Sequence, residues 1–244
     1  MTIKVAVVGA TGRMGKLALE LIDAAQDMSL HAALDSRSEL AEVLGADVVF
    51  DVTLPDVSPT VVKFCVDNGL KVVVGTSGWS AAKLASVEAQ LKHAPDAAAV
   101  IIIPNFSIGS MLASKFAALA APYFDSIEIV EAHHAGKIDS PSGTAVRTAE
   151  MIGTARAELT QPLIPGVGQE ARGQVVAGVP IHSMRLAGVS AKQEVYFGGI
   201  DEVLTISHDT ASTKAYTQGI LLCVRKAAAA TGLVVGLQAV IEGN

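Results

Sequence analysis

The stretch Ile3–Gly15 reads I-K-V-A-V-V-G-A-T-G-R-M-G and decides the fold of this chain. Its apolar run, Ile3–Val8, is typical of a strand that is buried on both faces of a parallel sheet. Three glycines at the spacing G-x-x-G-x-x-G follow at once, and the next segment, Lys16–Ala25, has apolar residues at helical spacing. The stretch therefore predicts a strand, a glycine turn and a helix in immediate succession, as in an α/β domain.

The same glycines suit a nucleotide. Glycine permits a tight turn and lets a pyrophosphate approach the backbone, and the following helix N-terminus offers free N–H groups. Asp35 comes after a predicted strand, Leu30–Leu34, where a carboxylate can accept hydrogen bonds from a ribose. Ser36 and Arg37 follow it and could accommodate a 2′-phosphate, so we expect NADH to bind and NADPH not to be excluded. Arg37 is equally typical of a solvated surface, and a plain turn is the alternative for the glycines.

Apolar runs and helical patterns alternate through the rest of the first half. This alternation indicates a doubly wound parallel sheet with helices on both faces. The predicted strands are Val48–Val52, Val72–Val74 and Val100–Ile103, and the predicted helices are Ser58–Asn68 and Ala81–Lys92.

The pattern changes after Pro104. Strands now follow one another, which predicts an antiparallel or mixed sheet in a second, α+β domain. The expected elements are helices at Ile108–Phe124 and Ser142–Ala157, strands at Ile127–His133, Ile181–Leu186, Gln193–Gly198 and Glu202–Ser207, a loop at Gln161–Gln174, and a last helix at Thr213–Ala230 before Gly232–Leu237. If the last helix packs on the first domain, that domain is discontinuous and comprises 1–106 and 214–244, leaving 107–213 for the second.

Composition excludes several classes of protein. The chain has 244 residues, 50% of them apolar and 17% charged, which excludes a disordered chain. Its longest apolar runs, such as Ala97–Ile103, are far shorter than the ~18 residues of a membrane span. Met1–Ala10 does not resemble a secretory signal, so we expect a cytoplasmic protein with no membrane partner. A net charge of −6 without a basic cluster argues against nucleic acid. Cys65 and Cys223 lie in apolar stretches and are expected to be reduced core thiols.

Two further loops follow predicted strands. Gly75–Gly78 reads G-T-S-G, and Pro104–Ser107 reads P-N-F-S. Ligands of open α/β sheets bind beyond the carboxyl ends of the strands, so both loops are expected near a nicotinamide or its ribose. Each tetrapeptide is also compatible with a simple turn.

The densest reactive stretch is Glu131–Thr144, E-A-H-H-A-G-K-I-D-S-P-S-G-T. It runs from a strand end into a helix, whose first N–H groups suit a carboxylate. Lys137 adds a positive charge, and histidine is the side chain best suited to deliver a proton near neutral pH. The stretch therefore predicts a site that holds an anionic small molecule.

Other interpretations of this stretch were weighed. Zinc binding by His133 and His134 is disfavoured, because neighbours on a strand point to opposite faces and no third ligand is nearby. The two histidines could instead be structural. A serine nucleophile lacks its G-x-S-x-G turn. Lys137 as a Schiff-base lysine stays open beside the simpler pairing with a substrate carboxylate.

Taken together, G-A-T-G-R-M-G, V-V-G-T-S-G, P-N-F-S, E-A-H-H-A-G-K-I-D-S-P-S-G-T-A and I-H-S-M-R-L-A-G resemble the 4-hydroxy-tetrahydrodipicolinate reductase (dihydrodipicolinate reductase) family over nearly the whole chain. The resemblance implies a Rossmann-like domain, a substrate-binding and oligomerisation domain, and NAD(P)H-dependent reduction in the diaminopimelate route to lysine. It also implies a homotetramer that uses NADH and NADPH and has a dicarboxylate substrate. The loop G-T-S departs from the usual G-T-T, and Asp35 replaces a Glu of some members.

The resemblance implies roles for individual residues, while the residues themselves lead us to expect no metal. His133 would be the acid/base residue, with Lys137 as its catalytic partner. Substrate carboxylates would be bound by His134, Ser142, Gly143 and Thr144. The cofactor would contact Gly9, Ala10, Thr11, Gly12, Arg13, Met14, Asp35, Gly75, Thr76, Ser77, Ile103, Pro104, Asn105 and Phe106.

The expected chemistry is hydride transfer from nicotinamide C4 to a carbon of a cyclic imine dicarboxylate, with domain closure about Pro104–Ser107 and the region before Thr213. One rival, an aspartate-semialdehyde-type dehydrogenase, needs a loop cysteine, but both cysteines fall in helical apolar patterns. The other rival, a nucleotide-sensing regulator, would not need the His/Lys cluster.

Overall fold

The computed structural model describes residues 2–159 and 168–243. These residues form two compact units: Met1–Ile108 with Thr213–Asn244, and Gly109–Ser212. Each unit has its own sheet, and the chain leaves the first unit and returns to it.

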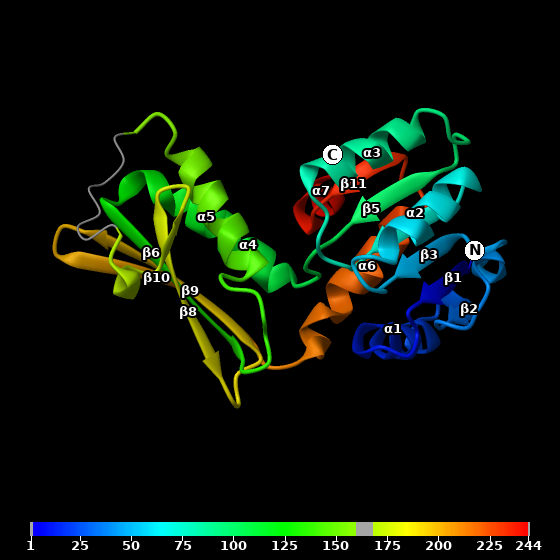
Figure 1. The fold of residues 1–244 in the computed structure, drawn as a ribbon, viewed down its shortest axis with the longest axis horizontal. Coiled ribbons are helices and arrows are strands. Elements are labelled where there is room, and N and C mark those ends of the chain that lie inside the picture. Colours follow the sequence, from blue (N-terminus) through cyan, green and yellow to red (C-terminus); the bar gives the residue numbers. More distant parts are fainter. Residues whose placement is uncertain (1, 160–167, 244) are drawn as a thin grey trace. The chain divides into compact units, whose positions relative to one another are not determined.

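The first unit contains a six-stranded sheet in the order β11-β5-β4-β3-β1-β2, with every pair of neighbours parallel (Figure 1). This confirms the predicted doubly wound sheet. Its strands are β1 (Ile3–Val8), β2 (Met28–Leu34), β3 (Val48–Asp51), β4 (Lys71–Val74), β5 (Ala99–Ile102) and β11 (Gly232–Val235). The sixth strand lies within Gly232–Leu237, for which the sequence pattern gave no element, and it pairs with β5.

Helices cover both faces of this sheet (Figure 1). They are α1 (Arg13–Ala24), α2 (Ser58–Asp67), α3 (Ala81–Leu91), α6 (Thr217–Ala227) and α7 (Leu237–Glu242), with short 3₁₀ turns η1 (Leu40–Val43) and η4 (Thr213–Tyr216). Residues of α2 and α3 pack in one core cluster with Ala6, Val49 and Val72. The predicted helix Thr213–Ala230 is divided, because its first turn is 3₁₀ and α6 begins at Thr217.

The strand order places a switch point beside β1. From β1 the chain passes to β2 on one side and then to β3 on the other. In open α/β sheets the crevice at such a point, beyond the carboxyl ends of the strands, is where ligands bind. Gly9 follows β1 and Val52 follows β3 at this point.

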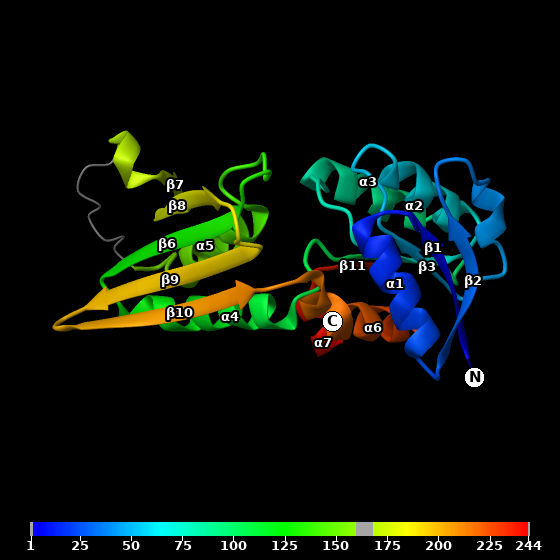
Figure 2. The same cartoon turned by 90° about the horizontal axis from the view of Figure 1, so that it is seen from below.

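The second unit contains a five-stranded mixed sheet in the order β10-β9-β6-β8-β7 (Figure 2). Strands β6 and β8 are parallel and the other neighbours are antiparallel, which confirms the expected mixed sheet. The strands are β6 (Ser126–His134), β7 (Gln174–Val176), β8 (Val179–Leu186), β9 (Ala191–Gly199) and β10 (Glu202–Thr210).

One face of this sheet packs against α4 (Ile108–Ala120) and α5 (Gly143–Ala155). Alternation along β6 directs Ile127 and Ile129 into that core, where Ala149 and Ile152 of α5 meet them. Helix α4 is shorter than the predicted Ile108–Phe124, because Pro122 lies in a 3₁₀ turn, η2 (Ala121–Tyr123), that follows it. Of the predicted loop Gln161–Gln174, residues 161–167 lie outside the described residues, and the rest contains the 3₁₀ turn η3 (Glu170–Arg172).

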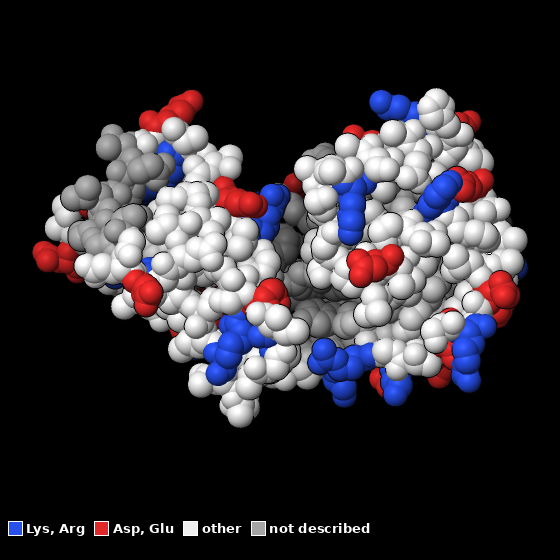
Figure 3. Space-filling view, in the orientation of Figure 1, with Lys and Arg blue, Asp and Glu red and all other residues white. Residues whose placement is uncertain are grey.

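Charged side chains are scattered over the face shown in Figure 3, where Lys and Arg alternate with Asp and Glu. Among the described residues no helix is long and apolar enough to span a membrane, and no group of three His, Cys, Asp or Glu could hold a metal ion. Cys65 and Cys223 are free and buried, as expected. Burial raises the pKa of each thiol to about 12, so neither cysteine has the reactivity of a catalytic nucleophile.

Candidate active site

The glycine loop after β1 is packed tightly against its surroundings. Gly9 has φ +90, and a Cβ on it would lie 2.8 Å from the Val52 carbonyl oxygen, in the loop after β3. A Cβ on Gly15 would lie 2.2 Å from the Gly9 carbonyl oxygen. Gly9 is therefore required where the glycine loop touches the loop after β3, and Gly15 is required where α1 touches the glycine loop.

Gly12 differs from the other two glycines. A Cβ on it would meet only the Gly9 carbonyl oxygen, at 3.4 Å, which is ordinary contact. Gly12 is the N-cap of α1, and no side chain caps the helix there. The first-turn N–H groups of α1 therefore have no capping side chain to accept them, and a small residue stands in front of them, as a phosphate site needs. Ala10, Thr11, Arg13 and Met14 complete this loop and helix start.

Asp35 lies directly after β2 and is paired with Arg37. Its two carboxylate oxygens accept from the Arg37 backbone N–H at 2.8 Å and from the guanidinium at 2.9 Å. The side-chain hydrogen bond from Arg37, then the backbone one, hold the pKa of Asp35 below its ordinary value. The carboxylate is thus ionised near neutral pH and suited to accept hydrogen bonds from ribose hydroxyls.

The loops after β3, β4 and β5 also meet. A Cβ on Gly75 would lie 2.8 Å from the Phe106 ring and 2.9 Å from Val52, so these three segments are in contact. The Thr76 hydroxyl donates to the Thr53 carbonyl oxygen at 2.9 Å. The structure therefore brings together the glycine loop, Gly75–Ser77 and Ile103–Phe106 at one edge of the sheet.

Two residues of this set are core residues. The side chains of Ile103 and Phe106 are buried, and the Phe106 ring packs on Phe50 with centroids 5.6 Å apart. These two could offer a cofactor only backbone atoms. Pro104 and Ser77 are exposed, and the Asn105 side chain accepts from the Ser107 backbone N–H at 2.9 Å.

Asp51, which the sequence analysis did not single out, ends β3 as a fully buried carboxylate. It accepts from the Thr53 hydroxyl at 2.7 Å and from the Ser58 hydroxyl at the start of α2. Burial raises its pKa, although these hydrogen bonds act in the opposite direction. Asp51 fixes the path of the loop that touches Gly9 and Gly75.

The second cluster lies in the other unit, at the end of β6. His133 is on the face of the sheet that the helices cover, whereas His134 is exposed and, by strand alternation, on the opposite face. The His133 Nδ1 lies 2.6 Å from Glu131 Oε2. The structure thus separates the two predicted histidines and gives His133 a carboxylate partner that the sequence analysis did not identify.

Glu131 is completely buried and multiply bonded. It accepts two hydrogen bonds from the Arg185 guanidinium, both at 3.0 Å, and one from the Ser142 backbone N–H at 3.2 Å. Burial raises its pKa, but hydrogen bonds from Arg185, Ser183 and His133 outweigh burial and leave the pKa below its ordinary value. Glu131 is therefore an anion within the unit.

The pKa of His133 is shifted as well. Burial lowers its pKa, Glu131 acts against this, and the charges of Lys137 and Arg185 add to the lowering. The net pKa lies below the ordinary value. The imidazole is thus mainly neutral near pH 7, and its protonated form is a stronger acid than an exposed histidine.

Lys137 lies in the turn after β6. Its Nζ donates to both carboxylate oxygens of Asp139, at 2.6 and 2.7 Å, and this bond lowers the pKa of Asp139. The Lys137 side chain is 20% exposed. A charged, partly exposed ammonium close to the helix start is suited to a carboxylate ligand.

Helix α5 begins shortly after this lysine in the chain. Ser142 is its N-cap and accepts from the Ala145 backbone N–H at 3.2 Å. A Cβ on Gly143 would meet nothing within 4 Å, so the space before it is open, and no acidic residue lies in the first turn. The Ser142 N–H already binds Glu131, so an anion at this helix start would meet the N–H groups of Gly143 and Thr144.

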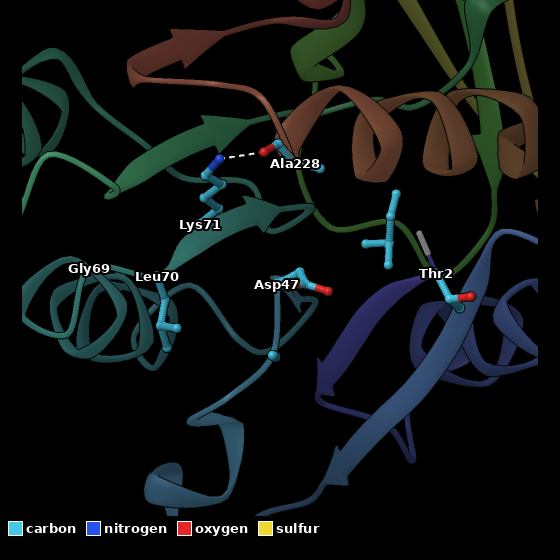
Figure 4. Close-up of a pocket in the computed structure, with 8 residues that line it drawn as sticks. Thr2, Asp47, Gly69, Leu70, Lys71 and Ala228 are labelled. Carbon is cyan, nitrogen blue, oxygen red and sulfur yellow. Dashed lines mark hydrogen bonds between the residues drawn. The ribbon is translucent and has the colours of Figure 1, made fainter.

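A cavity in the first unit lies elsewhere. It is lined by Thr2, Asp47, Lys71 and Ala228, with Lys71 donating to the Ala228 carbonyl oxygen (Figure 4). Apart from Ala228, which follows α6, its lining residues precede or begin β1, β3 and β4, so the cavity lies at the amino ends of these strands. Because ligands of such sheets bind at the carboxyl ends, this cavity is not the candidate site.

Comparisons with known proteins cover both units of the chain. The family model "Dihydrodipicolinate reductase, N-terminus" matches residues 3–106, and "Dihydrodipicolinate reductase, C-terminus" matches residues 109–241. The 4-hydroxy-tetrahydrodipicolinate reductase of Clavibacter sepedonicus is 54% identical over 242 residues, 99% of this chain and 87% of the relative. That of Mycolicibacterium smegmatis is 43% identical over 243 residues, 98% of this chain and 99% of the relative.

Solved structures are similar too. Dipicolinate-bound dihydrodipicolinate reductase from Paenisporosarcina sp. TG-14 superposes with a TM-score of 0.80 at 32% identity, covering 98% of this chain and 99% of that one. A probable dehydrogenase from Thermotoga maritima, at 13% identity and a TM-score of 0.60 over 98% of this chain and 92% of that one, shares the fold alone.

Proposed function

The chain belongs to the dihydrodipicolinate reductase family, and from this premise we propose that it reduces 4-hydroxy-tetrahydrodipicolinate to tetrahydrodipicolinate with NADH or NADPH. This reaction is a step of the diaminopimelate route to lysine. The observation that carries the proposal is the cluster at the end of β6, where a partly buried imidazole, a lysine and the start of α5 lie within one short segment.

We assign the dinucleotide to the domain of residues 1–106 and 214–244. The residues fit such a group, because Gly12 leaves the start of α1 open and Asp35 is ionised beyond β2. Gly9–Met14 would hold the pyrophosphate, Asp35 a ribose, and Gly75–Ser77 with Ile103–Phe106 the nicotinamide end. When bound, the reduced nicotinamide supplies a hydride from C4. Arg37, exposed and held by Asp35, is available to a 2′-phosphate, which is why we include NADPH.

We assign the dicarboxylate substrate to the domain of residues 107–213. Lys137 and the N–H groups of Gly143 and Thr144 would hold its carboxylates, with His134 and the Ser142 hydroxyl as further contacts. Fixing the anion at two points orients the ring carbon that accepts the hydride. The balanced reaction takes up one hydride and one proton and releases the 4-hydroxyl group of the substrate as water. His133 would donate the proton, directly or through water, and its lowered pKa favours release of that proton.

The assembly and compartment are proposed on separate observations. Large apolar side chains, Met184, Tyr196 and Val203, are exposed on the face of the mixed sheet that the helices leave open, and they suit a homotetramer formed through residues 107–213. Two free cysteines suit the reducing cytoplasm.

Oxidation of NADH and NADPH, followed by absorbance, tests the proposed function. The substrate is formed in place from pyruvate and aspartate semialdehyde by the preceding synthase. We expect substrate-dependent oxidation by the wild type and a loss of about 10²–10³-fold in kcat/KM in Lys137→Ala, because a positioned charge is removed. The circular dichroism spectrum should be unchanged.

Lys192→Ala is the matched control, since Lys192 also pairs with a carboxylate two residues ahead, Glu194 at 3.0 Å. It should retain wild-type turnover. Full activity in Lys137→Ala would exclude the role of Lys137, and cofactor binding without oxidation by the wild type would exclude the proposed reaction.

A further inference from the structure

Strand β6 carries a carboxylate where its pattern calls for an apolar residue. Ile127 and Ile129 point into the core of the second unit, and Glu131 continues the same alternation at 0% exposure. Burying an anion is costly unless hydrogen bonds and an opposite charge compensate it. Glu131 has both, because Arg185 donates to each of its oxygens.

The partners of this one carboxylate belong to every part of the second cluster. Glu131 Oε2 contacts His133 Nδ1 at 2.6 Å, and Glu131 Oε1 accepts from the Ser142 N–H that precedes α5. Arg185, besides holding Glu131, donates to the Asp139 carbonyl oxygen at 2.6 Å. Asp139 in turn binds the Lys137 ammonium. The imidazole, the lysine turn and the helix start therefore depend on a single ion pair.

We propose that Glu131, held by Arg185, is a positioning residue that fixes the tautomer and orientation of His133 for proton donation. The proposal rests on the role of His133 in the proposed function and adds a residue to it. The alternative is that Glu131 stabilises the fold and has no effect on proton donation by His133.

The tautomer follows from the geometry. An ionised carboxylate only accepts hydrogen bonds, so the imidazole nitrogen that faces it must carry a hydrogen. Nδ1 of His133 is that nitrogen. In the neutral imidazole Nε2 is then unprotonated, and in the imidazolium Nε2 carries the only ring proton that Glu131 does not hold. The donated proton therefore leaves from Nε2, and the imidazole that remains is the Nδ1–H tautomer that Glu131 stabilises.

The charges around His133 decide the direction of the pH effect. Glu131 on its own strand favours the protonated imidazole, whereas Lys137 of the turn and Arg185 of β8 disfavour it. Strand β9 contributes no charge on this face, because Ala191 pairs with His133 and Gln193 pairs with Glu131. Neutralising Glu131 therefore lowers the pKa of His133, and the protonated form is lost at a lower pH.

The same strand offers a matched control. Glu128, on the opposite face of β6, also accepts from a histidine, His182 Nε2 at 2.7 Å, and from an arginine, Arg172. It contacts none of the residues of the second cluster in the described structure. Glu128→Gln removes the same chemistry from the same strand without touching His133.

The experiment compares kcat and KM of wild type, Glu131→Gln and Glu128→Gln with NADH between about pH 5 and 9. For Glu131→Gln we expect kcat to fall roughly 10–100-fold, the range typical when the hydrogen-bond partner of a metal-binding histidine is removed, with a small change in KM. The high-pH limb of its kcat profile should move to lower pH. Glu128→Gln should match the wild type. A fall in kcat without movement of the limb, or the same changes in both variants, would overturn the proposal.

A second measurement uses the wild type alone and so survives a variant that does not fold. Long-range ¹⁵N–¹H spectra of histidine-labelled protein, with His133→Gln for assignment, report the tautomer of His133. The proposal requires neutral His133 to be protonated at Nδ1, and protonation at Nε2 would contradict it. Because this readout needs no turnover, it is separate from the coupled assay, in which an inactive wild type would refute the proposed function instead.

Discussion

His133 and His134 are neighbours in the chain with opposite surroundings. His133 is half-buried and bonded to an ionised carboxylate, whereas His134 is exposed and lies beside the turn at Gly136, whose Cβ would stand 3.5 Å from its Nδ1. Strand alternation accounts for the difference, because successive side chains point to opposite faces. Of these two neighbours, His133 is the one with the environment of a group that exchanges a proton.

This difference predicts a split in kinetics. His133→Gln should lower kcat by roughly 10²–10³-fold, since a proton donor contributes about that much, and leave the substrate KM within a few-fold. His134→Gln should do the reverse, raising KM about tenfold, as expected for one lost hydrogen bond to a charged group, with kcat nearly unchanged. Steady-state assays with varied substrate measure both. Equal losses of kcat in the two variants would contradict the assignment of roles.

The three glycines of the loop after β1 have different structural roles. A side chain is excluded at Gly9 by the Val52 carbonyl oxygen and at Gly15 by the Gly9 carbonyl oxygen, whereas Gly12 has room for one. Sequence spacing treats the three alike. The packing of the loop against its surroundings shows that the fold requires Gly9 and Gly15. At Gly12 the requirement comes instead from the phosphate that we propose to bind at the start of α1.

Alanine substitutions should separate the role of these glycines in stability from their role in NADH binding. Gly15→Ala places a methyl 2.2 Å from the Gly9 carbonyl oxygen and should lower the free energy of unfolding by about 1–3 kcal/mol, as overpacking does, and weaken NADH binding as well. Gly12→Ala should leave stability within about 1 kcal/mol of wild type yet still weaken NADH binding, because its methyl faces the helix start.

Urea unfolding and fluorescence titration with NADH measure the two quantities. Equal stability of the two variants would show that the contact at Gly15 relaxes without cost. NADH binding by Gly12→Ala as tight as wild type would remove Gly12 from the cofactor site.

At the scale of the whole molecule, the exposed apolar face of the mixed sheet bears on assembly. Native light scattering should give about four times the 25.1 kDa of one chain. Val203 is 68% exposed, so Val203→Asp should not disturb a folded subunit but should shift the mass toward smaller species. Leu44→Asp, at 46% exposure in the other unit, is the control and should keep the wild-type mass. A wild-type monomer would refute the proposed tetramer.

Most of the fold was predictable from local pattern. The apolar run Ile3–Val8 matches β1, and the strand runs through Ile103 match β2–β5 to within two residues at each end. Periodicity succeeds here because continuous apolar strands alternating with amphipathic helices have few other ways to bury their side chains. It gave nothing for β11, whose partner β5 lies more than a hundred residues earlier in the chain.

Residue spacing and strand or helix periodicity are local properties, and they sufficed to predict the doubly wound sheet, a second sheet that is antiparallel or mixed, and the reactive segment Glu131–Thr144. Only the tertiary structure decided that Glu131 joins His133, Ser142 and Arg185, and that Gly9, Val52, Gly75 and Phe106 come together. Arg185 lies 54 residues from Glu131, and no local pattern indicates such a contact. The pairing of β6 with β8 brings Arg185 to the buried carboxylate of Glu131, and strand pairing across such a sequence distance is a property of the folded chain.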